Sequence, residues 1–126
     1  MNAARAGAPR RTGAHYESLA LQHLERAGLE LLERNFTCRH GEIDLVMRER
    51  DALVFVEVRY RRASGFGDGA DSVSAAKRRR LVSAASAWLA AHPRLANQAC
   101  RFDVVAIGGG EAQPTLDWLR NAFEAF

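Results

Sequence analysis

The chain has 126 residues, of which 48% are hydrophobic and 26% charged, and its net charge is +3. This length and composition predict a single globular domain with a core of ordinary size. No apolar run approaches the roughly 20 residues that cross a bilayer, and no apolar stretch follows the N-terminal arginines, so we expect no membrane association and no secretory signal. Cys38 and Cys100 lack metal-type spacing, which is typical of a reduced, cytoplasmic protein.

The N-terminal third of the chain predicts a tail, a helix and a strand. Residues 1–11 contain several arginines and no apolar pattern, so we expect a flexible basic tail, with residues 12–126 forming the folded domain. Thr12 is a suitable N-cap for a helix over 12–27, in which apolar residues recur at helical spacing. A first strand is expected over 29–36, although its pattern is mixed.

Two segments, residues 41–46 and 53–59, alternate with the two-residue period of a β-strand. The short polar linker between them favours an antiparallel hairpin with residues 50–51 at the turn. In that register Asp44 lies directly opposite Glu57, with Cβ atoms roughly 4.5–5.5 Å apart, where like charges repel. A divalent cation between the two carboxylates would convert this repulsion into attraction, which indicates metal-dependent phosphoryl chemistry.

The same register makes a prediction about the two faces of the hairpin. Ile43, Leu45 and Met47 should share one wholly apolar face with the even-numbered valines of the second strand. Asp44 and Glu57 then belong to the opposite face. A slip of one residue would turn the apolar set outward, so this arrangement is strongly specified.

The C-terminal half predicts a helix and one or two further strands. The helix should start near Ser72 or Ser74 and end before Pro93. A strand over 100–107 can then lie parallel to the Glu57 strand through a right-handed crossover. Residues 115–126 can form a short terminal helix or a strand. The expected fold class is therefore α/β, a mixed β-sheet flanked by helices in a single domain.

Basic residues cluster after the hairpin and on the second predicted helix. Seventeen of the eighteen basic residues are arginines, and Lys77 is the one lysine. Residues 61–71 read as a mobile loop beside the carboxylates, and the run 77–80 could either form a solvated face or neutralise backbone phosphates. The residues that we expect to bind nucleic acid are Lys77, Arg78, Arg79, Arg61 and Arg62.

Asp44, Glu57 and position 59 have the acid, acid-x-base spacing of the PD-(D/E)xK nucleases. Residues i and i+2 of a strand share a face, so Glu57 and Arg59 should both point toward Asp44. Mg²⁺ or Mn²⁺ accepts oxygen ligands of this kind and would acidify an attacking water. Asp103 also lies in a predicted strand, but beside Arg101 it is expected to form a structural ion pair.

A wider pattern extends over about residues 13–123. It consists of residues 41–46, 53–59, 101–107 and 121–123, together with Glu17, residues 34–36, Val73 and Lys77. This pattern resembles the YraN-like family of small bacterial proteins. The resemblance implies a restriction-endonuclease-like fold related to archaeal Holliday junction resolvases. It also implies metal ligation by Asp44 and Glu57, and it suggests Glu17 as a third catalytic and metal-binding residue.

Two of these positions keep alternative interpretations. Glu17 can equally be an exposed helical glutamate near the N-terminal end of its helix. At position 59 the family pattern has Lys and this chain has Arg, which is a poor general base. Arg59 could stabilise charge on a phosphate or pair with Glu42 across the hairpin. Lys77 could reach the site in its place, although exposure alone favours a solvated lysine.

The sequence therefore predicts a metal-dependent DNA endonuclease that uses Mg²⁺ or Mn²⁺ and acts on branched or damaged duplex. The preference for branches rests on the resemblance alone, as does the possibility of a homodimer. One alternative is a non-catalytic nucleic-acid-binding module in which Arg59 marks the loss of activity. Another is a protein-interaction domain whose acidic residues are structural.

Overall fold

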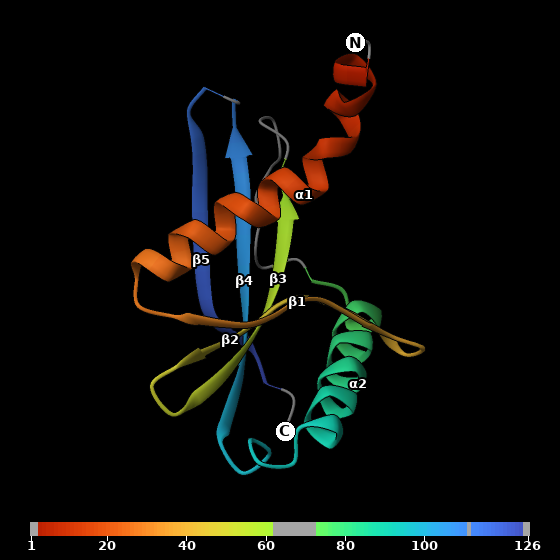
Figure 1. Cartoon of the computed structure of the whole chain (residues 1–126), viewed down its shortest axis with the longest axis vertical. Helices are drawn as coiled ribbons and strands as arrows, with labels where there is room; N and C mark the ends of the chain where they lie inside the picture. Colours follow the sequence, from red (N-terminus) through yellow and green to blue (C-terminus); the bar gives the residue numbers. More distant parts are fainter. Residues whose placement is uncertain (1–2, 62–72, 111, 125–126) are drawn as a thin grey trace.

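The computed structural model describes residues 3–61, 73–110 and 112–124, and the side chains from residue 13 onward. A single mixed sheet of five strands, in the order β1-β2-β3-β4-β5, lies at its centre (Figure 1). The elements are α1 (Ala3–Arg26), β1 (Glu30–Cys38), β2 (Gly41–Glu49), β3 (Ala52–Tyr60), α2 (Ala75–Ala91), β4 (Ala99–Gly109) and β5 (Pro114–Phe123). The expected single α/β domain with a mixed sheet flanked by helices is confirmed at this level.

Strands β2 and β3 form the predicted antiparallel hairpin. Glu49 pairs with Ala52, so the two residues 50–51 make the turn, and the pairing continues as far as Leu45 opposite Val56. Arg50 adopts a positive φ of 56°, which is a common device for closing a tight turn. The predicted hairpin register is confirmed from the turn to Leu45 and Val56, but the strand pairing ends there and does not include the predicted pair of Asp44 and Glu57.

The rest of the sheet is assembled through a helical crossover. Strand β4 runs parallel to β3, with Glu57 aligned to Val104, and α2 connects the two strands. Helix α2 begins after Ser74, whose Oγ accepts a hydrogen bond from the Lys77 amide at 3.1 Å, as expected for an N-cap. The C-terminal segment, for which helix and strand were both open, forms β5 antiparallel to β4.

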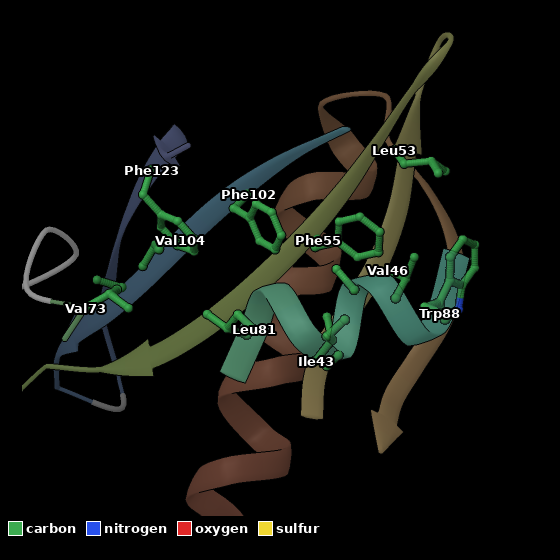
Figure 2. Close-up of a cluster of buried hydrophobic side chains, with 13 residues drawn as sticks. Ile43, Val46, Leu53, Phe55, Val73, Leu81, Trp88, Phe102, Val104 and Phe123 are labelled. Carbon is green, nitrogen blue, oxygen red and sulfur yellow. The ribbon is translucent and has the colours of Figure 1, made fainter. Parts of the chain in front are cut away.

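The two helices cover opposite faces of the sheet, and each face has its own apolar core. Figure 2 shows the core beneath α2, where Phe55, Trp88 and Phe102 pack together. The core on the α1 face is built from Ala20, Leu24, Leu29, Leu45, Met47, Val54, Val56, Val105 and Ile107. Because residues of β3 alternate between these cores, the odd-numbered side chains from Leu53 onward belong to the α2 face.

Some boundaries differ from the sequence-based expectation. Helix α1 starts at Ala3, so Thr12 lies inside the helix and is not its N-cap, and residues 3–11 belong to α1 where a tail was expected. A helix can continue past a residue that favours the N-cap position, because that preference amounts to only about 1 kcal/mol and the hydrogen bonds of the longer helix can outweigh it. Of the expected loop over 61–71, all but Arg61 lies outside the described residues. No helix in the described ranges is long and apolar enough to cross a membrane.

Candidate functional site

The side-chain alternation of β2 breaks at Asp44. Ile43 packs into the core beneath α2, whereas Leu45 packs into the core beneath α1, so the prediction that these two residues share a face is wrong. In β1, Arg34 pairs with Leu45 and Phe36 with Ile43, and the intervening Asn35 has a positive φ of 57°. A left-handed residue rotates the strand, and the rotation changes which face the following side chains occupy.

This rotation places the Asp44 carboxylate between the separating ends of β2 and β3. The backbone pairing of these strands ends at Leu45 and Val56. Beyond that point the Val58 amide donates a hydrogen bond to Asp44 Oδ2 at 2.8 Å. The carboxylate therefore takes the position of a backbone carbonyl, and it satisfies a donor that the diverging strands leave unpaired.

Glu57 approaches the same point from the α2 face of β3. Its side chain is almost fully buried, with 8% of the residue exposed. Lys77 Nζ, on the first turn of α2, lies 3.4 Å from Glu57 Oε2. The sequence left open whether Lys77 could reach the site, and the structure brings it there. Lys77 pairs with Glu57 while 37% of its side chain stays exposed, so it is half-buried at the site.

The pKa values of both carboxyl groups are raised. Burial and then repulsion by Glu57 raise the pKa of Asp44 to about 7, and the Val58 amide offsets only part of this rise. Burial also raises the pKa of Glu57, although Lys77 and Arg59 oppose the shift. Both groups therefore occupy an environment in which an additional proton or cation is favourable.

Glu17 lies near this pair but has a partner of its own. Arg34 Nε is 3.5 Å from Glu17 Oε1, and another nitrogen of the same guanidinium donates to Ser18 Oγ at 3.0 Å. Glu17 is nevertheless close enough to raise the pKa of Asp44. Across the residues that the structure describes, no three carboxylates, imidazoles or thiols form a ready metal-binding group. The arrangement is thus a pair of carboxylates with Glu17 nearby.

The predicted nucleic-acid-binding residues are dispersed. Arg78 folds back, donating from Nε to the Val73 carbonyl at 3.0 Å, and its guanidinium lies 5.4 Å from the centre of the Phe123 ring. Arg61 forms an ion pair with Asp117 at 2.6 Å. Arg79 is exposed on α2, and Arg62 lies outside the described residues.

A cavity beside Glu57 gathers different basic residues. It has a volume of about 280 Å³ and is lined by Glu57, Arg59, Val73, Ser74, Lys77 and Arg80. Arg80 belongs to the predicted basic run 77–80 but was not among the residues expected to bind nucleic acid, although Lys77 and Arg80 stand three positions apart and therefore share a helix face. That spacing was the signal that could have identified it.

Asp103 is a structural residue, as expected. Its carboxylate accepts two hydrogen bonds from Arg101, at 2.9 and 3.2 Å. It also accepts hydrogen bonds from Trp118 Nε1 and from the Asn121 amide, both at 2.9 Å. With four donors around one buried carboxylate, Asp103 ties β4 to β5.

The fold and the site define a small α/β protein with a buried glutamate, a half-buried aspartate and a lysine where two strands of a mixed sheet diverge. The chain belongs to the Uncharacterised protein family UPF0102, whose sequence profile matches residues 16–107. This membership confirms the resemblance to a family of small bacterial proteins.

The similarity to relatives in this family extends over most of this chain and most of each relative. A UPF0102 protein of Yersinia pseudotuberculosis is 55% identical over 115 residues, which cover 90% of this chain and 95% of the relative. A UPF0102 protein of Stutzerimonas stutzeri is 53% identical, with the same two coverages. A relative from Pseudomonas putida is 51% identical, over 94% of this chain and 98% of its own.

Proposed function

We propose that this protein is a metal-dependent DNA endonuclease whose site is formed by Asp44, Glu57 and Lys77. The observation that carries the proposal is the closeness of two carboxylates, a buried Glu57 and a half-buried Asp44 whose pKa is raised to about 7. Structural ion pairs rarely bring two acidic groups together, whereas functional sites often do. The burial of both groups, and the repulsion of Asp44 by Glu57, are the cost that a bound cation would remove.

The topology supports a restriction-endonuclease-like fold, which we propose on the basis of the sequence resemblance. The antiparallel β2–β3 hairpin is followed by the α2 crossover and the parallel strand β4. This order places the carboxylate pair at the point where β2 and β3 diverge, between the two helical layers.

The donor set fits a divalent cation that keeps several waters. Asp44 and Glu57 would hold Mg²⁺ or Mn²⁺, since carboxylate oxygens are the ligands these ions prefer and two carboxylates are a common number for Mg²⁺. When bound, the cation would neutralise charge on a scissile phosphate and acidify a water. Glu17 forms an ion pair with Arg34, and we therefore assign it an electrostatic role outside the direct metal ligands.

Lys77 supplies the function that the nuclease pattern gives to the lysine at position 59. Its ammonium group contacts Glu57 Oε2 from α2, so a lysine reaches the carboxylate pair although β3 carries Arg59. An ammonium can orient a water and can lose its proton, whereas the guanidinium of Arg59 stays charged. We assign Lys77 to orienting the nucleophile and Arg59 to stabilising phosphate charge.

The direct test is cleavage of four-way, flap and linear duplex DNA in Mn²⁺. We expect wild-type protein to cleave at least one substrate, and Asp44→Asn, Glu57→Gln and Lys77→Met each to lower the rate by about 10²-fold or more. A double variant, Arg59→Lys with Lys77→Met, should recover part of the loss, because it returns the lysine to position 59. Asp117→Asn, which alters a carboxylate on β5, is the matched control and should cleave normally.

Three results would redirect the proposal. Equal cleavage by wild type and the three site variants would show a contaminating nuclease and remove the catalytic claim. DNA binding without cleavage, retained by Asp44→Asn, would favour the non-catalytic nucleic-acid-binding module. Neither binding nor cleavage, with no response of the carboxylate pair to Mn²⁺, would leave a protein-interaction domain with structural acids.

A further inference from the structure

Two tyrosines from distant parts of the chain stack on one another at the carboxyl end of β3. Tyr60 is the last residue of β3, and the centre of its ring lies 4.9 Å from that of Tyr16 on α1, with 16° between the ring planes. The ring of His15 lies 5.4 Å from that of Tyr16 and is tilted by 55°. Figure 1 shows α1 crossing the sheet at this end of β3. The helix and the strand therefore build one aromatic cluster.

The ring of Tyr60 is open to solvent, whereas the ring of Tyr16 is anchored in the fold. Tyr60 is 52% exposed. Tyr16 is half-buried and packs against the core beneath α1. Because Tyr16 covers one face of the Tyr60 ring, the exposed surface of that ring lies on its other face and its edge. A ring held in place by a stacked neighbour offers a further planar group a surface on which to stack.

The aromatic cluster adjoins the carboxylate pair on both of its elements. On β3, Tyr60 stands two residues after Val58, whose amide donates to Asp44 Oδ2 at 2.8 Å, and two residues of a strand span about 7 Å. On α1, Tyr16 directly precedes Glu17, which is close enough to raise the pKa of Asp44. A group stacked on Tyr60 would therefore lie beside the proposed metal site.

The chemistry of an exposed tyrosine ring selects among the parts of a nucleic acid. The ring offers its π face to a nucleobase and carries no charge that would attract a phosphate. In a duplex each base is stacked between its neighbours, so a base must leave that stack before it can lie on a protein side chain. The part of a nucleic acid that suits this surface is therefore an unpaired base, such as one in a flap.

We propose that Tyr60, held in place by Tyr16, stacks on an unpaired base of the DNA substrate and so positions a single-stranded segment beside Asp44 and Glu57. The identification of the ligand as DNA rests on the proposed function. Stacking on an aromatic ring tolerates any sequence, because every base has a π face. The substrate class is thus DNA with a single-stranded segment, bound without regard to which base stacks.

The test compares two fluorescent DNA strands by anisotropy in EDTA, where metal-dependent cleavage cannot occur. One strand is of mixed sequence, and the other has the same length but consists of abasic sites, so it keeps the phosphates and lacks the bases. We expect Tyr60→Leu, which keeps apolar bulk without a π face, to weaken binding of the normal strand about tenfold and of the abasic strand less than about twofold. Tyr60→Phe is the matched control, because it keeps the ring and should bind both strands as wild type does.

A second measurement separates the stacking surface from the proposed function. The chain contains two tyrosines, so protein with ¹³C-labelled tyrosine rings gives two sets of NMR signals, which Tyr60→Phe assigns. Adenosine, which has a base and no phosphate, should shift the Tyr60 signals of wild type, whereas ribose should not. If adenosine shifts them while DNA is neither bound nor cleaved, the stacking surface stands and the nuclease proposal fails. No shift with adenosine, or equal binding of the normal strand by wild type and Tyr60→Leu, would overturn the stacking proposal.

Discussion

Asp44 carries two opposing roles in the folded protein. Its carboxylate accepts the Val58 amide at 2.8 Å, which satisfies a backbone donor where the strands separate. The negative charge on the same group is unfavourable, because burial and the nearby Glu57 both act against it. The hydrogen bond from Val58 requires only an acceptor oxygen on residue 44. The negative charge of the carboxylate is required only by the proposed cation site.

The first prediction separates these roles with Asp44→Asn. The pKa of Asp44 is raised in the folded state from 3.8 to about 7, so the folded protein binds this proton more tightly than the unfolded chain does. The free energy of unfolding should therefore fall as the pH rises from about 4 to about 7. The amide cannot ionise but still accepts the Val58 hydrogen bond, so Asp44→Asn should be more stable at pH 8 by about 1–3 kcal/mol.

Urea denaturation at several pH values measures this difference. The gap between wild type and Asp44→Asn should shrink as the pH approaches 4, because the wild-type carboxyl is then protonated in the folded state and increasingly protonated in the unfolded chain. Asp44→Ala is the control, since it removes the acceptor together with the charge and should gain less. A wild-type protein as stable as Asp44→Asn at pH 8 would contradict the buried-charge interpretation.

At the scale of elements, the contact between the β1–β2 turn and α2 depends on a glycine. Gly41 has φ of 157°, and an added Cβ would meet the Arg80 carbonyl oxygen at 2.9 Å. We expect Gly41→Ala to destabilise the protein by about 1–3 kcal/mol, because a backbone group must move to accommodate the methyl group. Thermal unfolding gives the measurement.

Gly13 provides the matched substitution in a different environment. It lies within α1, and an added Cβ there would have no atom within 4 Å. Gly13→Ala should stabilise the protein by about 0.5–1 kcal/mol, because alanine favours the helix. If both glycine variants changed stability by the same amount and sign, the close contact at Gly41 would not be the cause.

The attachment of β5 to β4 depends on Asp103. Its buried carboxylate accepts hydrogen bonds from Arg101, Trp118 and Asn121, and Asn121 has a positive φ of 51°. Removing the carboxylate leaves several buried donors unpaired, so we expect Asp103→Ala to destabilise the protein by about 3–5 kcal/mol. Asp117→Ala, at an exposed ion pair on the same strand, should change stability by at most about 1 kcal/mol. Chemical denaturation of the two variants in parallel would disprove the assignment if the losses were equal.

Across the whole molecule, the sequence predicted what depends on local pattern. Alternation and a short polar linker were enough for the β2–β3 register, and Ser74 and Pro93 delimited α2. The crossover rule then gave the parallel pairing of β3 with β4. Each of these features follows from neighbouring residues and general rules of chain connection.

The remaining features depend on tertiary packing. The face change at Asp44 requires the left-handed backbone of Asn35 on the adjacent strand, and no alternation pattern within β2 reveals it. Lys77 contacts Glu57 because α2 packs on the sheet at a particular rotation, which the apolar stripe defines only approximately. Arg78 resembles its neighbours in sequence, yet it turns away to Val73 and Phe123.

The last prediction concerns the coupling of metal binding to the stability of the whole fold. Asp44 and Glu57 come from different strands, so they are held together only when the sheet is assembled. A cation that binds the folded state alone stabilises it by about 2.7 kcal/mol at one hundred times its dissociation constant. Mn²⁺ should therefore raise the melting temperature of wild type by several degrees, and Asp117→Asn should respond equally. Asp44→Asn should melt higher than wild type without metal and show no increase with it. An equal rise in all three proteins would mean that Mn²⁺ acts elsewhere and that the carboxylate pair is not its site.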